Sequence, residues 1–324
     1  MSKFSFPALP AGPPSRQNWY RELLDDPNCV GASIKVHEAY DVHRETYLSN
    51  QLKLFASHDT NPVTTDQALI KHLESEKRRK NQASDSVPPA QDDDLDWQDV
   101  NCLVVWARPP PYIIKFMEQL QSRIARIVGS DLHLIPEDHL HLSVIELSHR
   151  HPVPFLHSAV EQIGRQRIQN MLDMVGSLPN KPRLVCPQLS FDKMGLAINF
   201  LPSGEDQYTY HHLRSNMHAM ALESGASIDM CYTAPSAHVT LGRFVGSGFF
   251  ESQENSDRFL KAIAEINGSL VSDAGTIDLH EKASSPLVWH VGAEISLELQ
   301  LGYLKFGRGR EKASMTGKDD VEDA

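Results

Sequence analysis

A four-residue pattern that occurs twice in the chain sets the strongest limit on its fold. Residues 141–144 read His-Leu-Ser-Val, and residues 238–241, which begin 97 positions later, read His-Val-Thr-Leu. Each copy is a histidine, an aliphatic residue, a hydroxyl residue and an aliphatic residue, and each comes after a proline, Pro136 or Pro235. The alternation predicts a strand at each copy, with one apolar and one polar face.

The polar residues of each copy are expected to point into a cleft. Positions two apart in a strand share a face, so His141 shares one with Ser143, and His238 shares one with Thr240. The aliphatic residues face the other way and are expected to pack on helices. Burying two imidazoles and two hydroxyls without partners would be costly. If the two strands are neighbours, the four polar side chains form one site.

Residues 100–310 predict a mixture of strands and helices around these two copies. Strands are expected at 102–107, 139–147, 183–189, 195–200 and 237–244, and helices at 112–128, 154–175, 207–222 and 256–270. Residues 275–306 are expected to be rich in strands. Because the order includes a hairpin at 183–200, it favours an α+β fold over a purely parallel α/β sheet.

Most of the net charge of −11 lies in two acidic segments and not in the main domain. Residues 85–99 contain six acids and no Lys or Arg, and residues 311–324 contain five acids and two lysines. We therefore expect a helical N-terminal extension at 1–80, a disordered acidic linker at 81–99, the main domain at 100–310 and a disordered acidic tail at 311–324. The nearly neutral main domain does not suit a long duplex nucleic acid, but it allows a short or single-stranded one.

Cysteine usage and hydropathy suggest a reducing compartment. The four cysteines are widely spaced, and no run of 18 apolar residues occurs. We expect a monomer without a cofactor and without a membrane contact, in the cytoplasm. Residues 77–80, Lys-Arg-Arg-Lys, are either a solvated helix end or a nuclear-localisation signal, so a nuclear location stays open.

Two histidines and two hydroxyls suit in-line attack on a phosphodiester. One neutral histidine accepts a proton from the nucleophile, and the other, protonated, donates one to the leaving oxygen. An unperturbed pKa of about 6.5 suits histidine to both roles. The hydroxyls of Ser143 and Thr240 would donate to the phosphate oxygens, so the chemistry needs no metal.

The paired motifs resemble the H-x-T/S signature of the 2H phosphoesterase superfamily. That family includes 2′–5′ RNA ligase-like proteins, cyclic nucleotide phosphodiesterases and exonucleases that trim the 3′ end of U6 snRNA. The flanking residues 136–141 and 237–244 agree with it, and the resemblance covers about residues 100–308. One departure is Ser143, where threonine is commoner. Residues 1–99 lie outside the resemblance.

The resemblance implies a two-lobed α+β fold with pseudo-two-fold symmetry and one motif in each lobe. It implies His141 and His238 as the acid–base pair, and Ser143 and Thr240 as phosphate-binding residues. The implied activity is metal-independent hydrolysis of 2′,3′-cyclic phosphates of nucleotides or RNA ends. The alternatives are a 3′-end-trimming exonuclease of the same superfamily and a non-catalytic module that binds a nucleotide or an RNA end.

Two accessory residues lie near the second motif. Arg243 is either a bidentate phosphate ligand or a member of an ordinary salt bridge. Tyr232 is either a base-stacking residue or a core tyrosine.

Other histidines and one tryptophan allow further interpretations. His139 shares the predicted face of His141, so that pair is also compatible with a zinc site. The adjacent pair at 211–212 is expected at the surface of a helix, and Trp289 and His290 are candidates to line the cleft.

Overall fold

The structure is a computed structural model that describes residues 15–27, 29–57, 61–82, 100–230, 235–272 and 287–318. The helices are α1 (Arg21–Asp25), α2 (Ser33–Ala56), α3 (Gln67–Gln82), α4 (Pro111–Val128), α5 (Val153–Ile163), α6 (Arg165–Leu172), α7 (Tyr210–Glu223) and α8 (Gln253–Ser272). The strands are β1 (Asn101–Ala107), β2 (Leu132–Leu134), β3 (Leu142–His151), β4 (Arg183–Phe191), β5 (Gly195–Pro202), β6 (His238–Phe244), β7 (Trp289–His290), β8 (Glu298–Gly302) and β9 (Met315–Thr316). No helix within these ranges is long and apolar enough to cross a membrane.

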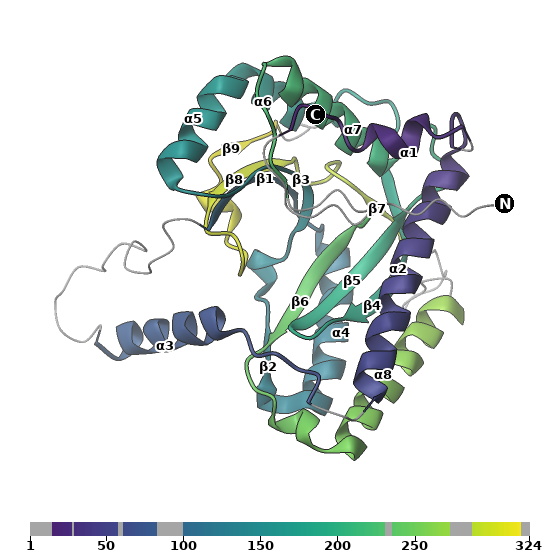
Figure 1. Ribbon diagram of the computed structural model, residues 1–324, viewed down its shortest axis with the longest axis vertical. Coiled ribbons are helices and arrows are strands. Elements are labelled where there is room, and N and C mark those ends of the chain that lie inside the picture. Colours follow the sequence, from purple (N-terminus) through teal and green to yellow (C-terminus); the bar gives the residue numbers. More distant parts are fainter. Residues whose placement is uncertain are drawn as a thin grey trace, which may run out of the picture.

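The described strands form one curled sheet in the order β7-β4-β5-β6-β3-β1-β8-β9, with β2 paired to β6 (Figure 1). Every pairing in these ranges is antiparallel. Helices α2, α4 and α8 lie along the β4–β5–β6 part, and α5, α6 and α7 lie around the β1–β3–β8 part. The expectation of an α+β fold is therefore confirmed at the level of class.

Local sequence explains where α4 begins and ends. Pro111 occupies its first turn, where a missing N–H costs no hydrogen bond, and the helix ends before Gly129, whose φ is 71°. Its buried residues recur at helical spacing, among them Ile113, Phe116 and Leu120. The single helix expected at 154–175 is wrong, because Gly164 adopts a φ of 93° and divides it into α5 and α6.

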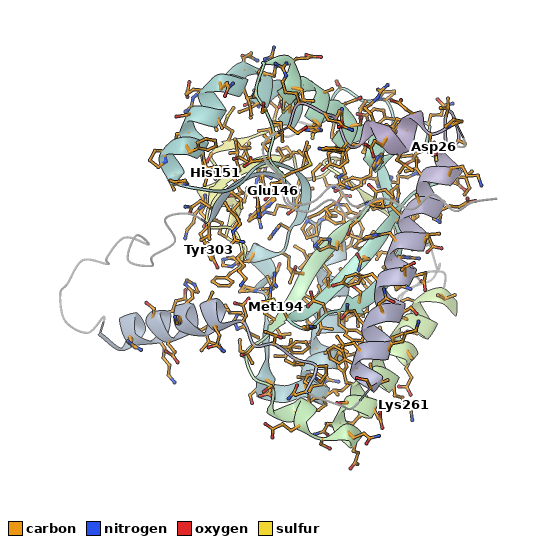
Figure 2. All side chains as sticks on the ribbon, in the orientation of Figure 1. Asp26, Glu146, His151, Met194, Lys261 and Tyr303 are labelled. Carbon is orange, nitrogen blue, oxygen red and sulfur yellow. The ribbon has the colours of Figure 1, made fainter. Side chains whose placement is uncertain are left out.

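The α1–α2 part of the N-terminal extension packs into the same core as the sheet (Figure 2). Phe55 of α2 is 1% exposed, and its ring lies 4.8 Å from that of Phe191 on β4 and 6.0 Å from that of Phe259 on α8. A buried aromatic cluster of this kind contributes several kcal/mol, on the order of 1.5–3 for each ring. The extension is therefore a structural part of the molecule.

The expected linker and tail have different outcomes. Residues 83–99 of the linker lie outside the described residues. The expectation of a disordered tail is wrong for residues 311–318, since β9 pairs with β8 and the backbone N–H of Gly317 donates to the carbonyl of Leu297 at 2.7 Å. Residues 319–324 lie outside the described residues. The strand-rich character expected at 275–306 is present in β7 and β8, and residues 273–286 also lie outside them.

The expectation that His211 lies at the surface is wrong. Its side chain is 0% exposed, because α7 lies between β3 on one side and α1 and α2 on the other. Its Nε2 donates to the carbonyl of Tyr20 at 2.8 Å, so its Nδ1 accepts from the Tyr40 hydroxyl at 2.9 Å. Burial lowers the pKa of His211 to about 3, and the nearby charge of Arg214 adds to this effect.

Acidification is therefore expected to destabilise the fold. Burial also lowers the pKa of His218, to about 4, whereas both histidines titrate at about 6.5 in the unfolded chain. Between these pH values the unfolded chain binds more protons than the folded protein. The free energy of unfolding therefore decreases as the pH falls below about 6.5. Each histidine contributes about 1.4 kcal/mol per pH unit. Urea unfolding from pH 7 to pH 5 measures this slope.

The matched variants for that series are His218→Gln and His157→Gln. His218 is 1% exposed and His157 is exposed on α5. The first variant should flatten the slope, and the second should leave it unchanged. An unaltered slope in His218→Gln would contradict the account.

Candidate active site

The two motif strands are neighbours in the sheet. Leu142 of β3 pairs with Val239 of β6 in antiparallel register. This register places His141 opposite Thr240 and Ser143 opposite His238, all four on one face. Leu142 and Val239 are both 0% exposed on the other face. The structure thus brings the four predicted site residues together.

Arg243 joins this face because β6 contains an extra residue. The register with β5 shifts between Leu196 and Ala197, so Leu241 is an extra residue with no register partner in β5. Without the shift, a residue three positions after Thr240 would point to the opposite face. Arg243 instead lines the same pocket as His238 and Thr240, and its buried Nε has no hydrogen-bond partner within the described part of the chain. An unpartnered cationic donor in a pocket wall suits an anionic ligand.

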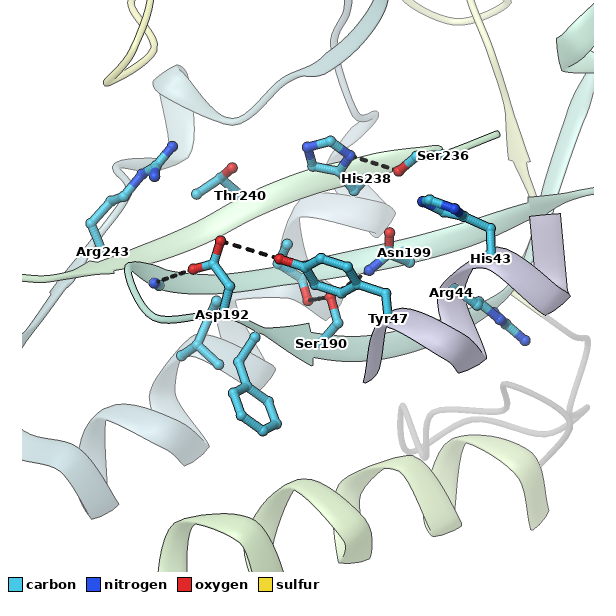
Figure 3. A pocket seen from close by; sticks show the side chains of 14 residues that line it. His43, Arg44, Tyr47, Ser190, Asp192, Asn199, Ser236, His238, Thr240 and Arg243 are labelled. Atoms are coloured by element: carbon cyan, nitrogen blue, oxygen red, sulfur yellow. Dashed lines mark hydrogen bonds between the residues drawn. The ribbon is translucent and has the colours of Figure 1, made fainter. Parts of the chain in front are cut away.

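The pocket beside His238 has a volume of about 170 Å³, and α2 forms one of its sides (Figure 3). The residues that line it are His43, Arg44 and Tyr47 of α2, Ser190, Phe191, Asp192, Gly195, Leu196, Ala197 and Asn199 of the β4–β5 hairpin, and Ser236, His238, Thr240 and Arg243. Nothing in the sequence of α2 marks its three residues as parts of a site, because their role depends on which face of the sheet the helix covers.

Hydrogen bonds hold the floor of this pocket. Asp192 Oδ1 accepts from the backbone N–H groups of Met194 at 2.7 Å and Gly195 at 2.9 Å, and its Oδ2 accepts from the Tyr47 hydroxyl at 3.3 Å. Both carboxylate oxygens of Asp192 are therefore engaged within the protein. Arg44 is engaged as well, because its Nη2 pairs with Asp41 at 2.9 Å and its Nη1 donates to the carbonyl of Cys186. Arg243, with its unpartnered Nε, is therefore the cationic side chain of the pocket that suits a ligand.

His141 is held against Trp106. The two rings are stacked with centroids 3.6 Å apart and planes 15° apart, and Trp106 is 1% exposed on β1. His141 Nδ1 lies 2.8 Å from the carbonyl oxygen of His139. Since a carbonyl only accepts, Nδ1 carries the proton, and Nε2 is the ring's acceptor in the neutral form.

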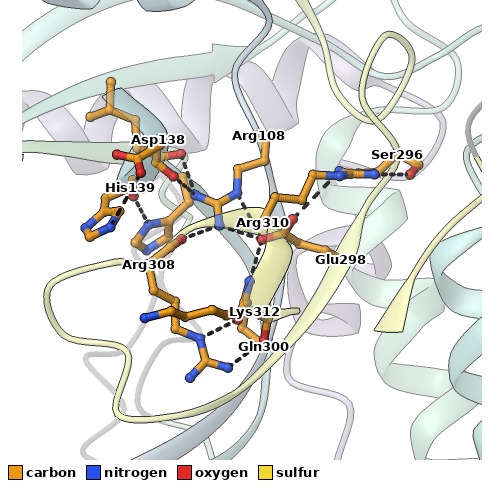
Figure 4. A network of polar contacts seen from close by, with 11 residues as sticks. Arg108, Asp138, His139, Ser296, Glu298, Gln300, Arg308, Arg310 and Lys312 are labelled. Carbon is orange, nitrogen blue, oxygen red and sulfur yellow. Dashed lines mark hydrogen bonds and ion pairs between the residues drawn. The ribbon is translucent and has the colours of Figure 1, made fainter. Parts of the chain in front are cut away.

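The segment before His141 is fixed by Arg108 (Figure 4). Its Nη1 donates to the carbonyls of Asp138 at 3.0 Å and Leu140 at 3.1 Å, and its Nε donates to Glu298 Oε1 at 2.9 Å. Arg108 and Glu298 are 6% and 0% exposed, so the pair is shielded from water. Sequence reasoning missed both residues, because nothing in their spacing links them to the motif.

Both motif histidines are neutral at pH 7. Burial is the largest cause, and it lowers the pKa of His141 to about 3 and that of His238 to about 4. The charges of Arg214 and Arg243 lower the pKa of His238 further, and Ser236 Oγ lies 2.9 Å from its Nδ1. A bound anion would act in the opposite direction and favour protonation of one imidazole.

The remaining sequence candidates have separate outcomes. Tyr232 is outside the described residues. His139 belongs to a 3-10 helix, Glu137–His139, and not to the expected strand, since β3 begins at Leu142. Among the described residues, His139 and His141 are not part of a group of three donors at metal-binding distance. Trp289 is 1% exposed and packs on Phe200 in the core, so it does not line the pocket.

Comparisons with known proteins do not name a family. No family model matches the chain, and no curated protein matches it. Among solved structures, it is similar to a conserved protein of unknown function from Agrobacterium tumefaciens, with 14% sequence identity and a TM-score of 0.42 over 67% of this chain and 90% of that one. The chemistry of the site therefore rests on its own residues.

The state of His141 can be read by nuclear magnetic resonance. Long-range ¹H–¹⁵N spectra, assigned with His141→Gln, should show Nδ1 protonated and Nε2 unprotonated at pH 7. The midpoint should lie below pH 5 in the free protein, because burial lowers the pKa to about 3. Inorganic phosphate should raise it by about one unit or more. A free-protein midpoint near 6.5, or a proton on Nε2 in the neutral ring, would contradict this description.

Proposed function

We propose that this protein is a metal-independent phosphodiesterase that hydrolyses 2′,3′-cyclic phosphates of nucleotides or short RNA ends. The observation that carries the proposal is the register of the two motifs, which sets His141 opposite Thr240 and His238 opposite Ser143 on one polar face. The resemblance to 2H phosphoesterases rests on the same residues.

The arrangement of the sheet supports the two-lobed fold that this family implies. Strands β3 and β6 share one register pair, whereas β1 and β3 share seven. In the described sheet, β3-β1-β8-β9 lie on one side of this narrow junction and β6-β5-β4-β7 on the other, with β2 paired to β6 as a ninth strand. Each half contributes one motif. We interpret the halves as two lobes related by a pseudo-two-fold axis.

The proposed reaction uses the two histidines in turn. A substrate phosphate between the imidazoles would favour protonation of one of them. The neutral histidine accepts a proton from water while the water oxygen attacks phosphorus. The bond from phosphorus to one ribose oxygen breaks, and the protonated histidine donates its proton to that oxygen. Ser143, Thr240 and Arg243 would donate hydrogen bonds to the phosphate oxygens.

The size of the pocket supports a small substrate. At about 170 Å³, the pocket beside His238 is small for a ligand site, which favours a short anionic end over a duplex. Arg243 lines it with an unpartnered donor, whereas Asp192 and Arg44 bond within the protein. Recognition of an anionic end therefore does not require a basic surface, which agrees with the net charge of −11.

Removal of either motif histidine should abolish turnover. His141→Ala and His238→Ala are expected to lower kcat on 2′,3′-cyclic nucleotides by about 10²–10⁴-fold, because each removes one proton-transfer group. The assay contains EDTA, and the exposed His157→Ala on α5 is the control. Full activity in either motif variant would disprove the assignment. Tight nucleotide binding without turnover in the wild type would instead identify the non-catalytic module.

Arg243 should contribute to phosphate binding. Arg243→Met keeps much of the side-chain volume and removes the buried donor, so KM for a 2′,3′-cyclic nucleotide should rise by about tenfold or more. The exposed Arg126→Met on α4 is the matched control. An unchanged KM and kcat in Arg243→Met would leave Arg243 without a part in substrate binding.

A further inference from the structure

Three side chains of different chemistry converge on β1 and β3, further along the strands from His141. Cys102 Sγ lies 3.6 Å from His149 Nδ1, which lies 2.8 Å from Glu146 Oε1. The three donor atoms all lie within 4.8 Å of one another, and each residue is half-buried. Figure 2 places Glu146 on this part of the sheet, near His151.

The backbone of β3 is bent so that these side chains share a face. In a regular strand Glu146 and His149 would point to opposite faces, because they are three positions apart. The register with β1 shifts twice here, which leaves Leu147 and Arg150 as extra residues on either side of His149. Arg150 has a φ of 60°, a conformation that costs a non-glycine residue about 1–2 kcal/mol. The fold thus maintains an irregular strand that aims His149 at Cys102 and Glu146.

The donor set and its spacing suit zinc. A thiolate, an imidazole and a carboxylate are the usual zinc ligands in proteins. In a tetrahedral site, Zn–S and Zn–N bonds of about 2.3 and 2.0 Å separate sulfur from nitrogen by about 3.5 Å. The separation between Cys102 and His149 is 3.6 Å. The separation between Glu146 Oε1 and His149 Nδ1, 2.8 Å, would lengthen by about 0.5 Å if both atoms bound one tetrahedral zinc ion.

A second contact fixes the backbone of His149. The backbone N–H of His149 donates to Asp229 Oδ1 at 3.2 Å, and Asp229, which is 8% exposed, also contacts His151 Nε2. Supporting contacts of this kind reduce the reorganisation that metal binding requires. We propose that Cys102, Glu146 and His149 bind one Zn²⁺ ion, with water in the fourth position.

This site is separate from the proposed phosphodiesterase centre and does not depend on it. It shares a face of β1 with Trp106, which contacts His141, but none of its three ligands belongs to either motif or lines the pocket beside His238. Metal binding is therefore measured without reference to turnover.

Cobalt substitution tests the proposal directly. The full chain is stripped with a chelator, and Co²⁺ is then added as a spectroscopic substitute for zinc. One equivalent should produce a thiolate-to-cobalt charge-transfer band, and Zn²⁺ should displace it. Cys102→Ser should abolish the band, and Glu146→Gln and His149→Ala should weaken binding by about 100-fold or more. Cys186→Ser, at an exposed cysteine, and His141→Ala should retain it.

Each other outcome argues against the site. The absence of a band in the wild type, or its persistence in Cys102→Ser, would overturn the proposal. Loss of the band in His141→Ala would place the metal at the motif histidines instead. Circular dichroism of each variant separates a lost ligand from a lost fold. If Cys102→Ser or His149→Ala is unfolded, Glu146→Gln, which preserves the shape of the side chain, tests the metal site in their place.

Discussion

The buried guanidinium of Arg214 connects both motif strands to the N-terminal extension. It is 3% exposed, and its Nε donates to the carbonyl of Val144 at 3.0 Å, at the end of the first motif. Its Nη1 donates to the carbonyl of Ser236 at 3.4 Å, just before the second motif. Its Nη2 and Nη1 also donate to the hydroxyls of Tyr20 and Tyr40 in the N-terminal extension, each at 3.1 Å. Because a buried charge is costly unless its donors are satisfied, these four elements are held in one arrangement.

The same charge sets the electrostatic state of the histidines around it. After burial, Arg214 is the next cause of the lowered pKa of His43, His211, His218 and His238. Four imidazoles near one guanidinium therefore stay neutral at pH 7, which avoids repulsion in the core. The consequence for chemistry is that His238 is a proton acceptor in the free protein. A phosphate anion beside it would favour the protonated imidazole, which is the form that can act as a general acid.

Sequence predicted the parts of this fold that depend on local pattern. The alternation at 141–144 and 238–241, the apolar spacing of α4 and the hairpin of β4 and β5 all follow from side-chain periodicity. It missed what depends on the partner of each element. His211 was expected at the surface because helical periodicity does not reveal that a second layer covers α7. His149 reaches its face through an extra residue in β3, and a bulge leaves no local signature. Arg243 was named as a candidate, but the extra residue in β6 that turns it into the pocket could not be predicted.

Packing shows that residues before residue 100 take part in the site, although the sequence composition suggests a boundary there. The change of sequence character at about residue 100 suggests that the preceding helices are an addition. Yet α2 places His43 and Tyr47 in the pocket wall, and Tyr20 and Tyr40 bind the guanidinium that fixes both motif strands. Without these helices, Arg214 would lose two hydrogen-bond partners and the pocket would lose one side. Tyr20 and helix α2 are therefore required for the geometry of the site, although the motifs themselves lie entirely beyond residue 100.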